Sequence, residues 1–100
     1  MPQSSLFVFA KISPKDEHFE KAKKAIINIL PQTRQEPGCI QFELHENEHE
    51  KALFLYEEWE SESALEEHYQ QPYTAEVFEA YKEWLAVPVD IEKMKKCTSA

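Results

Sequence analysis

Apolar positions along the chain follow two periods, which together predict alternating strands and helices. Residues 5–13, 39–46, 52–59 and 87–94 either alternate apolar with polar residues or form short apolar runs, which is typical of β-strands. Between the first two of these segments, spacings of three and four residues predict a helix with the apolar stripe Phe19, Ala22, Ile26, Ile29 and Leu30. A second helical region precedes the last strand, restarts at Pro72 and has the stripe Val77, Phe78, Tyr81, Trp84 and Leu85.

Polar and proline residues mark the expected helix starts. Ser13 can cap the first helix, and Pro14 suits its first position because proline lacks the N–H that would be unpaired there. Ser61 or Ser63 is expected to cap the second helical region, where Ser63 and Glu66 match the spacing of a capping box. Both helical regions are therefore expected to begin directly after polar caps.

The resulting order, β-α-β-β-α-β, is the split-βαβ plan, an α+β architecture whose antiparallel sheet is covered by helices on one face. The first and third strands have apolar residues at both odd and even positions, which predicts that both faces of the sheet are shielded from water. Alternation places Phe7, Phe9, Phe54 and Tyr56 on one face and Leu6, Val8, Leu53 and Leu55 on the other. One face packs under the helices, so we expect the other to pack against a second copy in a homodimer.

Composition narrows the classes of partner. The 100 residues suit a single domain, residues 1–100, with its core at about 5–95 and a tail at 96–100. The formal net charge of −8 disfavours nucleic acids and anionic membrane surfaces, which repel an acidic protein. No apolar run is long enough to span a bilayer, and we expect no signal peptide. Cys39 and Cys97 lack the spacing of a metal or redox motif, so we expect reduced thiols and a cytoplasmic location.

An acid, an indole and an imidazole gather around the turn from the third strand to the second helical region. Strand alternation puts Glu57 and Trp59 on the same face, and helical spacing puts His68 on the inward stripe. These side chains are expected to converge at one corner of the sheet, beside a dry chamber that the second copy helps to enclose. Spacing leaves two interpretations open: a reactive pocket, or a core with Trp59 as a half-buried anchor and His68 as a hydrogen-bonded packing residue.

The same segments resemble the antibiotic biosynthesis monooxygenase domain family. Its pattern runs through Glu-x-Gly-Cys, an aromatic residue three positions later, then Glu-x-Trp-x-Ser, a Leu, and a His three residues beyond that Leu. In this sequence those positions are Glu36, Gly38, Cys39, Phe42, Glu57, Trp59, Ser61, Leu65 and His68. The resemblance covers nearly the whole chain and implies a ferredoxin-like fold that dimerises into an α/β barrel, with no metal, flavin or haem cofactor.

Members of the family that this chain resembles include small quinol monooxygenases and an isomerase of phosphorylated autoinducer-2. The resemblance implies a small-molecule substrate, with O₂ as the second substrate in the oxygenating members. His68 would relay protons, Glu57 would orient the imidazole or accept a hydroxyl proton, and Trp59 would stack on a planar ring. Substrate contacts are expected at Phe42, Leu55, Tyr69 and Tyr73. Some aromatic-polyketide oxygenases have Asn where this chain has Leu55, so their oxyanion contact is not expected.

Two further observations bear on the choice of function. His45 to His49 spells His-Glu-x-x-His, a zinc-protease signature that needs both imidazoles on one helix face. Here the segment falls on a strand end and a turn, so we expect solvated side chains and no zinc site. Arg34 is the only arginine, which weakens the case for a phosphorylated substrate. The alternatives to a monooxygenase of an aromatic or quinol compound are an isomerase and a dimeric small-molecule-binding protein without turnover.

Overall fold

The computed structural model describes residues 5–98, so residues 1–4 and 99–100 of the expected single domain lie outside the described part of the chain. Its elements are, in order, β1 (Leu6–Ile12), a 3₁₀ turn (Asp16–His18), α1 (Phe19–Arg34), β2 (Cys39–Asn47), β3 (Ala52–Trp59), α2 (Glu62–Tyr69), α3 (Pro72–Trp84) and β4 (Asp90–Met94). The four predicted strands and both helical regions are present, and Pro72 is the first residue of α3 as expected.

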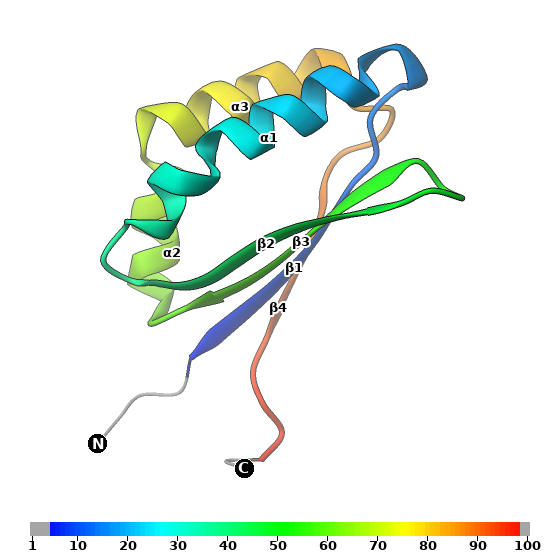
Figure 1. Cartoon of the computed structure of the whole chain (residues 1–100). Helices are drawn as coiled ribbons and strands as arrows, with labels where there is room; N and C mark the ends of the chain where they lie inside the picture. The colour runs from blue at the N-terminus through cyan, green and yellow to red at the C-terminus, as the bar shows by residue number, and fades with distance from the viewer. Residues whose placement is uncertain (1–4, 99–100) are drawn as a thin grey trace.

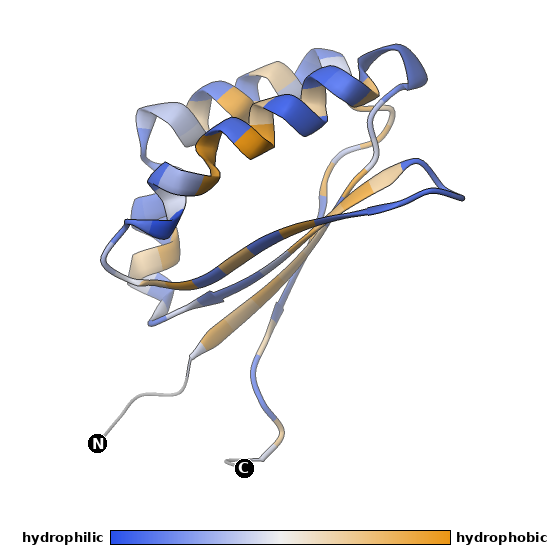
Figure 2. Ribbon diagram, viewed as in Figure 1, coloured by the Kyte–Doolittle hydropathy of each residue, from blue (hydrophilic) through white to orange (hydrophobic). Residues whose placement is uncertain are grey.

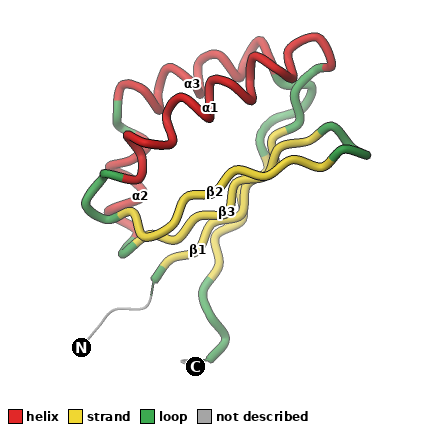
Figure 3. Tube along the Cα trace, viewed as in Figure 1, coloured by secondary structure: helices red, strands yellow, loops and turns green. Residues whose placement is uncertain are grey.

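The strands form one antiparallel sheet in the order β2-β3-β1-β4. In the central strand β1, Leu6 lies opposite Trp59, and Ala10 lies opposite both Leu55 and Ile91. α1 and α3 run side by side across one face, and α2 lies at the end of the sheet where β3 finishes (Figure 1, Figure 3). This arrangement confirms the predicted α+β, split-βαβ class with a ferredoxin-like topology.

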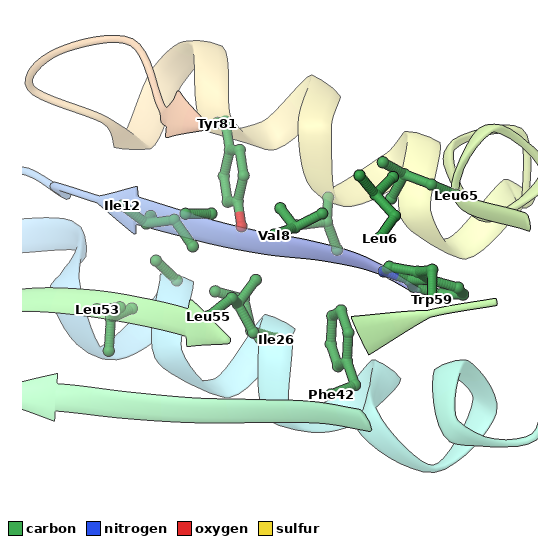
Figure 4. Packing of buried hydrophobic residues seen from close by; sticks show 13 residues of the cluster. Leu6, Val8, Ile12, Ile26, Phe42, Leu53, Leu55, Trp59, Leu65 and Tyr81 are labelled. Atoms are coloured by element: carbon green, nitrogen blue, oxygen red, sulfur yellow. The ribbon is translucent and has the colours of Figure 1, made fainter. Parts of the chain in front are cut away.

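The hydrophobic core lies between the helices and one face of the sheet (Figure 4). Alternate residues of β1 and β3 are buried there, namely Leu6, Val8, Ala10, Ile12, Leu53, Leu55 and Trp59. α1 contributes Ala22 and Ile26, and α3 contributes Val77 and Tyr81, all members of the predicted stripes. Both long helices alternate hydrophobic and hydrophilic segments along their length, as amphipathic helices do (Figure 2).

The start of α1 differs from the prediction. Ser13 is not its cap and Pro14 is not its first residue, because this segment stays extended and lies against the end of α3. Pro14 forms a β-bridge with Leu85, and the Ser13 carbonyl accepts a hydrogen bond of 2.8 Å from the Ala86 amide. The 3₁₀ turn then leads into α1 at Phe19. A distant backbone partner therefore prevails over the local capping preference.

The start of α2 depends on one of the two serines considered above. The Ser61 hydroxyl accepts a hydrogen bond of 3.2 Å from the Ala64 amide, so Ser61 is the cap. Ser63 lies inside the helix, and the predicted capping box of Ser63 and Glu66 is therefore wrong. The Ser61 cap sets where α2 leaves the sheet, and with it the position of His68 about two turns further on.

Gly38, the only glycine of the chain, brings the start of β2 close to α2. A Cβ at this position would lie 2.3 Å from the Ala64 Cβ, far inside van der Waals contact. The Gly38 carbonyl also accepts a hydrogen bond of 2.8 Å from the Glu60 amide, which ties the loop to the end of β3. Its φ is not positive, so glycine is needed here for the close approach and not for a left-handed turn.

The other face of the sheet is also apolar, and none of the described helices covers it (Figure 1). Phe7 and Tyr56 are ring neighbours on this face, as are Phe9 and Phe54, with centroids 6.3 and 5.7 Å apart. Phe9 lies in the central strand and is nevertheless 40% exposed. The predicted second apolar face is therefore present, whereas the second copy expected to cover it stays a prediction. Within residues 5–98, no helix combines the length and apolar character needed to cross a membrane.

We expect Gly38→Ala to lower the free energy of unfolding by about 1–3 kcal/mol, because the added methyl group overlaps the Ala64 side chain. Urea denaturation followed by circular dichroism measures this change. Ala64→Gly alone should cost about 1 kcal/mol through helix propensity. The double variant should regain part of the loss of Gly38→Ala, since one of the two clashing methyl groups is gone. Strictly additive losses would contradict a direct clash.

Candidate active site

Glu57, Trp59 and His68 meet on the helix-facing side of the sheet, where β3 leads into α2. They are buried, with 4%, 0% and 3% of their surfaces exposed. The Trp59 indole N–H donates a hydrogen bond of 2.8 Å to Glu57 Oε1. The centroid of the His68 ring lies 4.8 Å from that of Trp59 and 5.5 Å from that of Phe42. The structure thus brings these three predicted site residues together, and the indole N–H is already occupied by Glu57.

Glu36, and not Glu57, is the carboxylate that holds the imidazole. Glu36 Oε2 lies 2.9 Å from His68 Nδ1 and also accepts a hydrogen bond from the Tyr73 hydroxyl. The Thr74 hydroxyl lies 3.5 Å from the same nitrogen. Because an ionised carboxylate can only accept, Nδ1 carries the proton and Nε2 is left as the basic nitrogen of the ring.

Sequence reasoning identified Glu36 only as a position of the family pattern. It lies 32 residues before His68, in the loop between α1 and β2, and no local spacing connects the two. The sequence signal that marks this loop is the Pro37-Gly38 pair, which stops α1 and restricts the backbone directly after the acidic residue. That signal indicates a fixed loop, but not which side chain the loop presents to the core.

Burial shifts both titratable groups toward their neutral forms. It raises the pKa of Glu57 from 4.5 to about 7, and the hydrogen bond from Trp59 acts in the opposite direction. Burial also lowers the pKa of His68 below 6.5, while the Glu36 carboxylate acts to raise it. Near neutral pH, the site holds a partly protonated carboxyl group and a neutral imidazole. Such a pair can take up or release a proton at little cost.

A cavity of about 30 Å³ lies beside these groups, between the sheet and the helices. A volume of this size holds about two water molecules. Its wall includes Glu57 and His68, and three of the four expected substrate-contacting residues: Phe42, Leu55 and Tyr69. Apart from a few hydroxyl groups the remaining wall is apolar, so the acid and the imidazole face a largely dry space.

Two of the predicted site residues lie away from this wall. Trp59 does not line the cavity, but it contacts two residues that do, through its hydrogen bond to Glu57 and its ring contact with His68. Tyr73 lines a separate groove between α1 and α3, and its hydroxyl is bound to Glu36. Neither side chain is part of the cavity surface, and Tyr73 is linked to it only indirectly, through Glu36 and His68.

Phe78 separates the cavity from two open grooves on the α3–β4 side of the molecule. It lines the cavity and both grooves, whose volumes are about 450 and 390 Å³. Its ring makes edge-on contacts with Tyr69 and Tyr81, with centroids 5.6 and 5.4 Å apart. Tyr81 and Val89 also line the cavity and one groove, and Tyr69 and Ile91 the cavity and the other, so among residues 5–98 Phe78 is the one side chain common to all three spaces.

Enclosure of the site by a second copy stays a prediction, but the site residues do not lie on the sheet face where that copy is expected. Glu57 and His68 lie on the face that the chain's own helices cover, whereas Phe9 and Phe54 lie on the opposite face. The reason is the strand period of two, which separates neighbouring residues of β3 to opposite sides. A copy packed on the outer face would support the sheet from behind without touching the cavity.

The His-Glu-x-x-His segment is not helical. His45 lies in β2 and His49 in the following turn, and both are exposed, as expected. Glu46 forms an ion pair of 2.6 Å with Lys23 of α1. Across residues 5–98, no three His, Cys, Asp or Glu side chains are grouped so that they could hold a metal ion.

Comparison with known proteins relates the chain to a family. A model of the antibiotic biosynthesis monooxygenase family matches residues 5–85. The uncharacterized protein sll1783 of Synechocystis sp. is 37% identical over 87 residues, which cover 85% of this chain and 57% of that protein. The chain therefore spans little more than half the length of this curated relative.

Solved structures share the fold over nearly the whole chain. Rv0793 from Mycobacterium tuberculosis superposes with a TM-score of 0.90 at 26% identity, covering 97% of this chain and 99% of that chain. PA3566 from Pseudomonas aeruginosa gives a TM-score of 0.91 at 22% identity, covering 98% of this chain and 99% of that chain. The arrangement of four strands and three helices is thus common to all three proteins.

We expect Glu57→Gln to be more stable than the wild type at pH 8 and similar to it at pH 5. A carboxyl group whose pKa is raised by folding binds its proton more tightly in the folded state, so wild-type stability falls as pH rises from 4.5 to about 7. The full shift corresponds to about 3 kcal/mol. Urea denaturation of both proteins at the two pH values measures the difference, to which His68 contributes equally in each. An equal difference at both pH values would contradict the raised pKa.

Proposed function

This chain belongs to the antibiotic biosynthesis monooxygenase family, and on that premise we propose that it is a cofactor-independent monooxygenase. Its substrates are a small phenolic or quinol compound and O₂. One observation carries the proposal: a neutral imidazole and a carboxyl group with a pKa of about 7 share the wall of a largely apolar cavity. This combination suits a reaction that starts by removing a proton from a hydroxyl group and ends by returning protons to oxygen.

The first step is removal of the substrate hydroxyl proton, because the resulting anion gives up an electron more readily than the neutral ring. His68 Nε2 is the base. Its imidazolium form is stabilised by the Glu36 carboxylate at Nδ1 and by the neighbouring Trp59 and Phe42 rings. The apolar wall excludes water, which would otherwise compete as a proton source for the substrate anion.

Oxygen then reacts with the substrate anion itself. One electron passes from the anion to O₂, and the two radicals join at a ring carbon to form a peroxide anion, which takes the proton back from His68. That carbon loses its hydrogen as a proton while the O–O bond breaks, which leaves a carbonyl group and water. Glu57 is placed to transfer protons in this last step, since its pKa lies near neutrality. The substrate supplies all four electrons, and one oxygen atom enters each product.

A phosphorylated substrate, as an isomerase of the family would take, fits this cavity less well. Among residues 5–98, no Lys or Arg lines the cavity wall, so a phosphate group would find no cation there. Arg34 instead donates to the Phe42 carbonyl at 2.9 and 3.0 Å and to Glu43 at 3.1 Å. An uncharged phenolic ring requires no such partner.

We also propose that two copies pair through the outer face of the sheet. The supporting observation is an aromatic surface in the middle of that face, formed by the exposed Phe9 and the half-buried Phe7, Phe54 and Tyr56. A soluble monomer rarely leaves such a surface open to water. In the proposed homodimer the two cavities lie on the outer sides, each complete within its own chain.

A cytoplasmic location is proposed from the thiols. Cys39 and Cys97 are both free, and burial raises the pKa of the Cys39 thiol to about 11. Unpaired thiols are typical of reducing compartments.

Wild-type protein should consume O₂ with at least one member of a panel of quinols, measured with an oxygen electrode. His68→Gln should lower kcat by about 10²–10⁴-fold, since glutamine can still donate to Glu36 but cannot carry the proton. Glu57→Gln should cause a loss in the same range. His45→Gln, which changes an exposed imidazole of β2, should leave the rate unchanged. Binding of the panel without oxygen uptake would favour a binding protein over an enzyme.

Phe9→Glu should convert the proposed homodimer to a monomer, because it places a charge in the middle of the outer sheet face. Sedimentation velocity at micromolar concentration measures the change. Ile27→Glu is the matched control, since Ile27 is 44% exposed on α1 and should leave the assembly intact. A wild-type monomer under these conditions would contradict the pairing.

A further inference from the structure

Tyr81 is a buried residue of the cavity wall, and no other described residue binds its hydroxyl group. The residue is only 8% exposed, and its ring points from α3 toward β1 (Figure 4). It forms part of the cavity wall. Across residues 5–98, its hydroxyl has no hydrogen-bond partner. Sequence reasoning assigned Tyr81 to packing alone, yet phenylalanine would pack equally well at this position.

An unsatisfied hydroxyl in a core costs about 1–3 kcal/mol of stability. Such a group takes its partner from the cavity, either a water molecule or a ligand atom that displaces that water. The cavity beside Tyr81 supplies a place for that partner, since its wall is mostly apolar and has few polar groups of its own.

Tyr81 joins the cavity wall from α3, whereas Glu57 comes from β3 and His68 from α2. In Figure 4 its ring stands near Ile12 and Val8 of β1. Burial and the nearby Glu57 carboxylate both raise the pKa of Tyr81, so its hydroxyl stays protonated and acts as a donor. The wall thus combines a proton acceptor and a hydrogen-bond donor that come from different elements, with mostly apolar side chains around them.

We propose that Tyr81 is a specificity-determining residue that donates a hydrogen bond to a second oxygen of the aromatic substrate, while the first oxygen faces His68 and Glu57. The ligand class is therefore a ring with two oxygen substituents, and a monophenol lacks the atom that Tyr81 contacts. This inference rests on the proposed function, because it uses the same cavity.

Room for the ring comes from the α3–β4 side. The cavity of about 30 Å³ is too small for a benzene ring, which displaces more than two water molecules. Phe78 contacts Tyr81 at a centroid distance of 5.4 Å and lines both outer grooves. A ring that displaces Phe78 outward would take its place beside the Tyr81 side chain and next to the cavity.

The test is equilibrium binding without oxygen, so that no turnover is needed. Wild-type protein and Tyr81→Phe are titrated under argon by isothermal calorimetry with phenol, catechol, resorcinol and hydroquinone. Tyr81→Phe should weaken binding of the dihydroxybenzene that the wild type prefers by about tenfold, or about 1.4 kcal/mol. The Kd of phenol should change by less than about twofold, since phenol makes no bond to Tyr81. The thermal midpoint of Tyr81→Phe should equal or exceed that of the wild type, because no hydrogen bond is lost.

Two tyrosine variants serve as controls. Tyr56→Phe lies on the outer sheet face and should bind all four compounds as the wild type does. Tyr69→Phe removes the other tyrosine hydroxyl of the cavity, and a selective loss there instead of in Tyr81→Phe would overturn the proposal. Equal weakening of phenol and dihydroxybenzenes would also overturn it, as would wild-type protein that binds none of them. Selective loss in Tyr81→Phe without any oxygen uptake would support the Tyr81 contact and reject oxygenation.

Discussion

The protonation behaviour of this site depends on the burial of two ionisable side chains. Glu57 and His68 are both buried on the inner face of a small sheet, and burial moves their pKa values toward each other. Neither group is left alone: the Trp59 indole binds one, and the Glu36 carboxylate binds the other. Without these two partners the acid and the imidazole would be costly to bury, and with them the chain keeps a proton donor and a proton acceptor inside its core.

The fold matters because it delivers these groups from three separate places to one end of the sheet. β3 supplies the acid and the indole, α2 supplies the imidazole, and the α1–β2 loop supplies the second carboxylate. A β-bulge between Cys39 and Gln41 shifts the pairing of β2 with β3 by one residue, so that Phe42 lies opposite Glu57. The Phe42 ring then packs against His68. The helices then cover this side of the sheet, so that Glu57 and His68 are buried within the chain itself.

Periodicity was sufficient to predict the elements, their faces and the corner where Glu57, Trp59 and His68 meet, because these follow from local geometry. Contacts between distant segments were beyond its reach. The partner of His68 lies in another loop, and the extended conformation at Ser13 depends on the end of α3. The side of the sheet on which the site lies could not be predicted for a related reason: two apolar faces do not reveal which one the helices cover.

The close approach of Gly38 and Ala64 has a consequence beyond stability. Gly38 stands two residues after Glu36, and Ala64 stands one helical turn before His68. The absence of a single methyl group therefore holds the loop and the helix at the spacing that keeps the proton on Nδ1 and the lone pair on Nε2. A wider contact here would move the Glu36 carboxylate away from the imidazole without altering a residue of the cavity wall.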